Sequence, residues 1–229
     1  MERARVICHM YTTIDGKINT ELPAYPESAD CDYAGEVYDN ITHTCGEAWG
    51  CGRQTFQNDN HPDLASLDTS NVRYEDHIIE GKNICFAFDR YGKVFWEHPY
   101  NEYTGWNSPV VEVLTRSVRP EFVAYLDSIG CGYMFCGQND LDLDEFLTKI
   151  TRDYGVKTFM LCGGPAINAE FMRRDLVDEI SLVVCPGVQG GRRELTSIGS
   201  ENLEGFPKFF TLDKAEILPH ATLHLIYKR

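Results

Sequence analysis

The sequence is short of basic residues for its size. It has 21 Lys and Arg against 35 Asp and Glu, which gives a formal net charge of −14. Such a surface repels nucleic-acid phosphates and anionic lipid headgroups at long range. We therefore expect neither nucleic acid nor a membrane as a partner. Any anionic ligand would need a local group of basic side chains.

The nine cysteines contain no C-x-x-C pair. Zinc sites need closely spaced ligand pairs, and His43, Cys45 and Cys51 do not supply them. Cys8 and Cys85 lie inside apolar runs, where a thiol serves as a small buried hydrophobe in a reducing compartment. We therefore predict neither a metal site nor a disulfide framework.

The chain also lacks an apolar run long enough to span a bilayer, and no signal peptide precedes its first apolar segment. These absences predict a cytoplasmic protein. A length of 229 residues with 43% hydrophobic content can fill a sizeable core. Because no linker divides the chain, we predict a single domain, residues 1–229.

Apolar runs and helical spacing predict an α/β fold with a mixed, mostly parallel central sheet. From residue 109 onward strands and helices alternate, which implies right-handed crossovers and helices on both faces of the sheet. We expect about eight strands, a common size for a sheet. The tail should add a C-terminal antiparallel hairpin. The strands are expected at 5–11, 48–52, 83–88, 109–115, 132–136, 156–161, 179–185, 209–215 and 222–227, and the helices at 33–44, 120–129, 142–154 and after 165.

Some finer features are also predicted. Asp142 with Glu145 has the spacing of a capping box at the start of an amphipathic helix. Phe95 and Trp96 could pair with the strand at 83–88 across a turn at Tyr91 and Gly92. The polar stretches 57–80 and 97–108 are expected to be loops, and the first is long enough to suggest a functional lid.

A strand at 156–161 runs through Gly163 and Gly164 into a helix that begins near Pro165. Glycine can take positive φ and lets a ligand approach the backbone, and proline suits the first helical position. The N–H groups of such a first turn favour an anion, most often a phosphate. The alternative is a tight strand-to-helix connection that binds nothing.

Three segments follow strands at the edge where parallel sheets bind ligands. They carry Gly52-Arg53-Gln54-Thr55, Thr115-Arg116 and Cys162-Gly163-Gly164, in that order and roughly fifty residues apart. This arrangement resembles the nucleotide-binding segments of the dihydrofolate-reductase-like fold. It is more similar to the reductase domain of bacterial riboflavin biosynthesis, the C-terminal domain of the bifunctional deaminase-reductase.

Four features carry the resemblance to that reductase domain, and together they cover most of the chain. They are Thr13-Ile-Asp-Gly-Lys17, similar to S-x-D-G-K/R; Gly52 to Thr55 followed by Asp59, Pro62 and Leu64; the Gly-Gly-Pro helix; and Leu176-Val-Asp-Glu179 with Pro186 and Gly190-Gly191.

The resemblance implies an NADPH-dependent reductase similar to 5-amino-6-(5-phosphoribosylamino)uracil reductase, which passes hydride to a small heterocyclic or sugar-derived acceptor. It also implies a homodimer. The guanidinium groups of Arg53 and Arg116 could each donate paired hydrogen bonds to a 2′-phosphate, which favours NADPH over NADH. The alternative for each arginine is a solvated surface charge. The cofactor-binding candidates are Gly52, Arg53, Thr55, Thr115, Arg116, Cys162, Gly163, Gly164, Pro165 and Ala166.

Hydride transfer is the cofactor's chemistry, so the protein needs to add only positioning and a proton donor. Asp15, Lys17 and Asp59 are the catalytic candidates. Asp59 ranks first, because the resemblance places the matching aspartate near the substrate. Asp15 beside Gly16 could instead form a turn.

The chain departs from the family pattern at two positions. Cys162 stands where the family commonly has an acidic residue, and Leu67 stands where it has a basic residue of the substrate pocket. The zinc deaminase signature is absent as well. We therefore expect a reductase-type domain alone, with a substrate that could differ from that of the biosynthetic enzyme.

Two other functions remain open at this point. A dihydrofolate or pteridine reductase would need a carboxylate on the first long helix, and Glu36 or Asp39 could supply it. The third possibility is a nucleotide-binding module without turnover.

Overall fold

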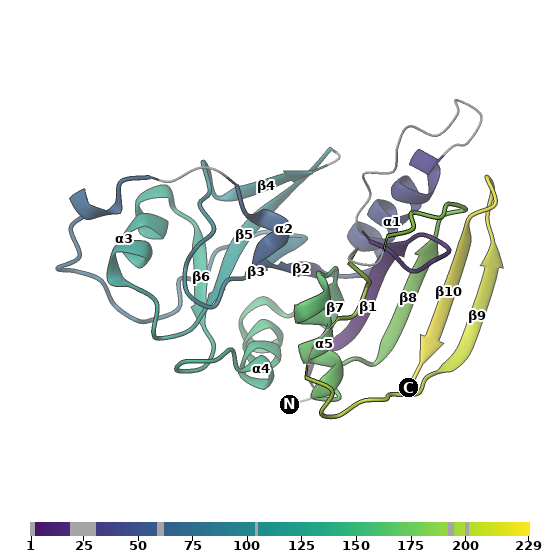
Figure 1. Ribbon diagram of the computed structural model, residues 1–229. Helices are drawn as coiled ribbons and strands as arrows, with labels where there is room; N and C mark the ends of the chain where they lie inside the picture. Colours follow the sequence, from purple (N-terminus) through teal and green to yellow (C-terminus); the bar gives the residue numbers. More distant parts are fainter. Residues whose placement is uncertain (1–2, 19–30, 59–61, 104, 192–194, 200–201) are drawn as a thin grey trace. The chain divides into compact units, whose positions relative to one another are not determined.

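The computed structural model describes residues 3–18, 31–58, 62–103, 105–191, 195–199 and 202–229 (Figure 1). The contacts between residues divide the chain into two compact units, and each is described by itself. Unit 1 consists of Met1–Ala4 and Glu47–Lys157, and unit 2 of Arg5–Gly46 and Thr158–Arg229. The single domain that the sequence suggests stays a prediction.

The described residues form ten strands, where about eight were expected. Parallel pairs outnumber antiparallel pairs within the units, so the mixed, mostly parallel α/β fold is confirmed. Unit 1 has β2 (Ala48–Gly52), β3 (Ile84–Phe88), β4 (Tyr100–Tyr103), β5 (Trp106–Leu114), β6 (Gly132–Phe135), α2 (Arg53–Phe56), η1 (Leu64–Ser66), α3 (Pro120–Ile129) and α4 (Leu143–Tyr154). Unit 2 has β1 (Arg5–Thr12), β7 (Thr158–Leu161), β8 (Glu179–Val184), β9 (Thr211–Ile217), β10 (Leu223–Lys228), α1 (Cys31–Cys45) and α5 (Pro165–Arg173).

In unit 2, β1 lies between β7 and β8 and is parallel to both. β10 is antiparallel to β8, and β9 is antiparallel to β10, so the predicted C-terminal hairpin is present (Figure 1). Successive side chains of a strand point to opposite faces. Met10 contacts Asn168 of α5, and Tyr11 contacts Tyr38 of α1. The two helices therefore cover opposite faces of this part of the sheet, as predicted.

In unit 1, β2, β3, β5 and β6 are parallel in that order. α4 packs on one face, where Phe146 meets Phe86 and Phe88 with ring centroids 5.3 and 4.9 Å apart. On the other face, the indole of Trp96 donates to Glu112 of β5, and Tyr125 of α3 binds the backbone of Trp96. Helices therefore cover both faces here as well.

Two predictions about unit 1 are wrong. Phe95 and Trp96 form no strand, because the Asp89 carboxylate accepts the N–H groups of Lys93 and Val94 and closes a tight turn. The second error concerns the stretch 97–108, which contains the hairpin of β4 and β5 rather than a loop. The polar residues of β4 give no apolar pattern, whereas Gly105, at φ 83°, indicates the turn of the hairpin.

Candidate functional site

The glycine turn of unit 2 joins β7 to α5. Gly163 has φ 100°, a conformation that side chains rarely adopt, and Pro165 occupies the start of the helix as predicted. Gly164 has φ −73°, so the expectation of positive φ holds for Gly163 alone. The peptide bond between the two glycines is cis.

The two glycines differ in the space around them. A Cβ on Gly163 would lie 3.2 Å from the Met10 methyl group, so this position excludes side chains by packing and by conformation. No described atom lies within 4 Å of the corresponding point on Gly164. Backbone at the second glycine is therefore open to a ligand, and the exposed Ala166 follows it in the first turn of α5.

Cys162 precedes the glycines and is buried. Its sulfur lies 3.8 Å from the Thr42 hydroxyl of α1. Burial, with a smaller contribution from the Asp39 carboxylate, raises the pKa of Cys162 to about 11, although hydrogen bonds from Tyr38 and Thr42 act in the opposite direction. The thiol is therefore neutral at physiological pH and replaces the family's acid with an uncharged group.

Asn168 lies beside the glycine turn and is a site candidate that the sequence argument missed. It is fully buried on α5, and its Nδ2 donates to the Ser197 carbonyl at 2.7 Å, whereas its Oδ1 has no partner among the described residues. Buried polar atoms are usually satisfied. A signal was available, because asparagine is a weak helix former and stands in the interior of this helix.

Asp15 lies in the turn after β1 and serves as an anchor. Its carboxylate accepts the Thr13 hydroxyl at 2.6 Å and the N–H groups of Gln189 and Gly190 at 3.1 and 2.8 Å. The Thr13 hydrogen bond in particular lowers the pKa of Asp15 to about 2, with the two backbone N–H groups contributing. A carboxyl group with this pKa is ionised at neutral pH. The catalytic role of Asp15 stays a prediction.

Of the other two catalytic candidates, Lys17 belongs to the same turn. Its N–H donates to the Thr13 hydroxyl, and its backbone forms an isolated bridge with Thr196. Its side chain is half-buried. Asp59 lies outside the described residues, and its role stays a prediction.

Unit 1 holds the other candidates, which follow β2 and β5. Gly52 ends β2 and is the N-cap of the short helix α2, whose first residue is Arg53. The Arg53 guanidinium donates to Gln57 one turn later, and Thr55 is exposed. Arg53 is half-buried, and both residues follow the carboxyl end of a parallel strand, where the sequence placed them.

Thr115 and Arg116 follow β5. Thr115 is fully buried, and its hydroxyl donates to the Arg90 carbonyl at 2.8 Å and lies 2.8 Å from the Ser117 hydroxyl. A ligand could use this hydroxyl only by displacing one of these bonds. Arg116 is exposed, and its Nη1 donates to the Tyr74 carbonyl at 2.7 Å.

Arg90, which the sequence argument missed, is a further arginine of unit 1 that follows a parallel strand. It follows β3 and lies 4.6 Å over the Tyr91 ring, while its Nε donates to the Asn139 carbonyl at 2.7 Å. Because Thr115 binds the backbone of Arg90, the loops after β3 and β5 are joined directly. The sequence could have indicated Arg90, because it stands two residues after its strand, as Arg116 does after the neighbouring strand.

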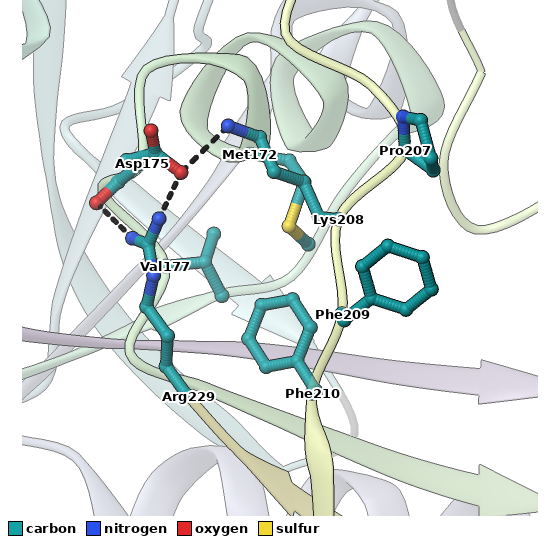
Figure 2. Close-up of a pocket in the computed structure, with 8 residues that line it drawn as sticks. All are labelled: Met172, Asp175, Val177, Pro207, Lys208, Phe209, Phe210 and Arg229. Atoms are coloured by element: carbon teal, nitrogen blue, oxygen red, sulfur yellow. Dashed lines mark hydrogen bonds and ion pairs between the residues drawn. The ribbon is translucent and has the colours of Figure 1, made fainter.

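A separate pocket of about 350 Å³ lies in unit 2 beside the end of β10 (Figure 2). Asp175 forms ion pairs there with Lys208, at 2.6 Å, and with Arg229, so two cations share one carboxylate. None of the candidate cofactor residues lines it. The lining residues are Met172, Asp175, Val177, Pro207, Lys208, Phe209, Phe210 and Arg229.

Within the described parts of the chain, no three His, Cys, Asp or Glu side chains gather as metal ligands would. The helices described there are too short or too polar to cross a bilayer.

Comparison with solved structures places the fold. A pyrimidine reductase-like protein from Corynebacterium diphtheriae is similar over 99% of this chain and 91% of that chain, with 12% identity and a TM-score of 0.66. The RibD protein of Acinetobacter baumannii is similar over 99% of this chain and 58% of that chain, with 16% identity and a TM-score of 0.63. At these identities the likeness concerns the fold alone.

Comparison with curated sequences adds a more similar relative. The 2,5-diamino-6-ribosylamino-4(3H)-pyrimidinone 5′-phosphate reductase of Aquifex aeolicus is 32% identical over 113 residues, 49% of this chain and 49% of the relative. The chain thus spans about half the length of the curated relatives that it matches. The model of the RibD C-terminal domain matches residues 4–220. Since this match covers nearly all of the sequence, the chain belongs to the RibD C-terminal domain family.

Proposed function

We propose that the protein is an NADPH-dependent reductase of a phosphoribosylaminopyrimidine, the type of reaction that makes a riboflavin precursor. Membership of the RibD C-terminal domain family over residues 4–220 carries the proposal. The names of its relatives support the substrate class, since the Aquifex aeolicus protein is a pyrimidinone 5′-phosphate reductase.

The glycine turn is proposed to bind the pyrophosphate of the cofactor. Open space at Gly164 and the helix that begins at Pro165 fit an anion approached by backbone N–H groups. The dihydronicotinamide supplies the hydride when the cofactor is bound. The neutral thiol of Cys162 adds no negative charge beside this turn, which favours a phosphate.

Arg53 and Arg116 are proposed to bind the 2′-phosphate of NADPH. They stand out in a protein with a net charge of −14, and a guanidinium matches phosphate geometry through paired N–H donors. The hydroxyl of Thr55 is exposed and suits the same role, whereas Thr115 would act by holding the loop that carries Arg116.

For the proton, we propose Asp59 and Lys17 as donors ahead of Asp15, whose carboxylate accepts three hydrogen bonds. Asp15 positions the turn that carries Lys17, because its carboxylate and the Thr13 hydroxyl fix the backbone there. The acceptor is proposed to be either the 2,5-diaminopyrimidinone phosphate or its deaminated uracil form. Leu67, in place of a basic residue, weakens any substrate-phosphate site at that position.

A pteridine reductase is the second candidate. Asp39 of α1 is half-buried and close enough to influence the pKa of Cys162, so a carboxylate on the first long helix lies near the glycine turn. Such a group could hold a pterin ring. Glu36 is exposed and is the weaker choice.

The test is to measure binding of NADPH and NADH by thermal shift and nucleotide fluorescence. NADPH oxidation is then followed with the diaminopyrimidinone phosphate, its deaminated form and dihydrofolate. We expect NADPH to bind more tightly and one of the pyrimidines to be reduced. Turnover of dihydrofolate alone would favour the second candidate. Binding without any turnover would favour a module that binds a nucleotide, and the absence of binding would contradict the proposal.

We also propose that the protein is a homodimer, as the resemblance to the riboflavin reductase domain implies. Large apolar side chains at the outer strand of unit 2 fit this proposal. Phe209 is 86% exposed and Ile217 is 84% exposed, and Leu212 is exposed between them.

A further inference from the structure

The segment 74–77 in unit 1 is fastened along β6, although the sequence around it suggests a loose loop. His77 and Tyr133 exchange two backbone hydrogen bonds, at 2.8 and 3.1 Å. The Asp76 carboxylate accepts the N–H group of Phe135 at 2.9 Å. Two residues of the long connection between β2 and β3, Asp76 and His77, are thus held against this strand, and we name residues 74–77 the strap.

A buried lysine also binds the strap, through an ion pair with Asp76. The Lys149 ammonium of α4 lies 2.8 Å from Asp76 Oδ2 and 3.0 Å from Glu145, and it donates to the Phe135 carbonyl at 2.6 Å. The Lys149 side chain is 10% exposed. Burial by itself would lower the pKa of Lys149, but its hydrogen bonds to Asp76 and Glu145 prevail and raise it. The Lys149 ammonium therefore stays charged at neutral pH.

The strap in turn holds Arg116. The Tyr74 carbonyl accepts Arg116 Nη1 at 2.7 Å, and the guanidinium lies 5.6 Å from the centre of the Phe135 ring. Tyr74 is itself fixed, because its hydroxyl donates to the Val118 carbonyl at 3.0 Å and its ring lies 5.3 Å from Phe135. An exposed arginine normally samples many rotamers. Here the Phe135 ring and the Tyr74 carbonyl limit it. Lys149 and Asp76 bind the backbone of Phe135, and Asp76 lies two residues after Tyr74 in the strap.

We propose that Lys149 and Asp76 are positioning residues that preorganise Arg116, through the strap and Phe135, for the 2′-phosphate of an adenine dinucleotide. The inference rests on the proposed function, since it assigns a purpose to a contact of the NADPH site. Fixing a flexible guanidinium in advance reduces the entropy lost when the phosphate binds. The pair thus contributes to cofactor choice without touching the cofactor.

The test compares dissociation constants for NADPH and NADH in the wild-type protein and in Lys149→Met. We expect NADPH to bind about tenfold more weakly, because a charge-assisted contact loses its preorganisation, and NADH to change by less than about twofold. Lys149→Arg keeps a cation within reach of Asp76 and should restore most of the preference. Tyr133→Phe is the matched control, because it removes a part-buried hydrogen bond from β6 to Asp127 of α3 and keeps the contacts of Lys149, Asp76 and Arg116.

Arg116→Ala and the double variant complete a double-mutant cycle with Lys149→Met. If Lys149 acts through Arg116, adding Lys149→Met to Arg116→Ala should not lower the NADPH preference further. Should Lys149→Met fail to fold, Asp76→Asn gives the same reading, because the amide oxygen still accepts the Phe135 N–H while the charge is lost. An unchanged preference in a folded variant overturns the inference and leaves the proposed function standing. Failure of the wild-type protein to bind either dinucleotide overturns both.

Discussion

Single residues in this protein show how burial decides charge. Glu112 on β5 is fully buried, and burial first and the neighbouring Asp89 carboxylate second raise its pKa well above the ordinary value of 4.5. One oxygen accepts the Trp96 indole at 2.5 Å, while Glu112 Oε2 and Asp89 Oδ1 have no partner among the described residues. A proton on Glu112 removes the repulsion between the two acids.

This raised pKa predicts a dependence of stability on pH. A carboxyl group whose pKa is higher in the folded state contributes its stability below the unfolded pKa and loses it as pH rises through the folded pKa. Glu112→Gln keeps the shape and supplies N–H donors at every pH. We expect the variant to melt close to the wild-type protein near pH 4 and clearly above it near pH 8.

Thermal unfolding followed by circular dichroism across this pH range measures the difference. Glu102→Gln on β4 is the control, because that side chain is exposed and should give no such trend. Parallel melting curves of Glu112→Gln and wild type at all pH values would contradict the assignment of a neutral Glu112.

Among the elements, α4 shows how far local sequence rules reach. Its bounds and its N-cap were predicted correctly, since the Asp142 carboxylate accepts the N–H groups of Asp144 and Glu145 at 3.1 and 3.0 Å. The second half of the capping box is wrong. Glu145 accepts the N–H group of Gly137 at 2.8 Å and pairs with Lys149, because tertiary partners compete for the same carboxylate.

The cap gives a prediction for α4. Asp142→Ala removes the acceptor for two N–H groups of the first turn and should lower the free energy of unfolding by about 1 kcal/mol. Asp144→Ala is the matched control, because it removes an exposed charge of the same turn and should cost less than about 0.5 kcal/mol. Urea unfolding of both variants measures the difference. Equal losses would show that helix charge, rather than the cap, accounts for the effect.

The strands and helices that follow a clear period were predictable, and the site was predictable only in part. Gly163, Pro165, Arg53 and Arg116 stand at element ends that the apolar pattern marks. The contacts that hold Arg116 were not predictable. Tyr74 and Asp76 are far in sequence from Arg116 and Lys149, and only the fold brings them together. Asp15 was predicted correctly as a turn residue. Its hydrogen bonds to Gln189 and Gly190 were not predictable, because these residues are far from it in sequence.

At the scale of the whole molecule, the proposed homodimer would explain the large apolar side chains that are exposed near β9. We expect light scattering after size exclusion to give a mass near twice the 26.1 kDa of the chain. Ile217→Lys places a charge on the outer face of β9 and should shift the protein toward the monomer, because burying an unpaired ammonium is unfavourable.

Val188→Lys is the control for that variant. Val188 is also a large exposed apolar residue, but it lies outside the terminal hairpin, so its substitution should leave the mass unchanged. A wild-type protein that elutes as a monomer at micromolar concentration would contradict the homodimer, and the catalytic proposal would be unaffected.

The strap has a consequence for solubility as well. β6 has β5 as its only strand partner among the described residues, and such a border strand invites pairing with foreign chains. The strap occupies the outward N–H and C=O groups of Tyr133 and the N–H group of Phe135. Loosening the strap would expose these groups for pairing with neighbouring molecules. Lys149→Met should therefore aggregate faster on storage than the wild-type protein, whereas Arg116→Ala should not.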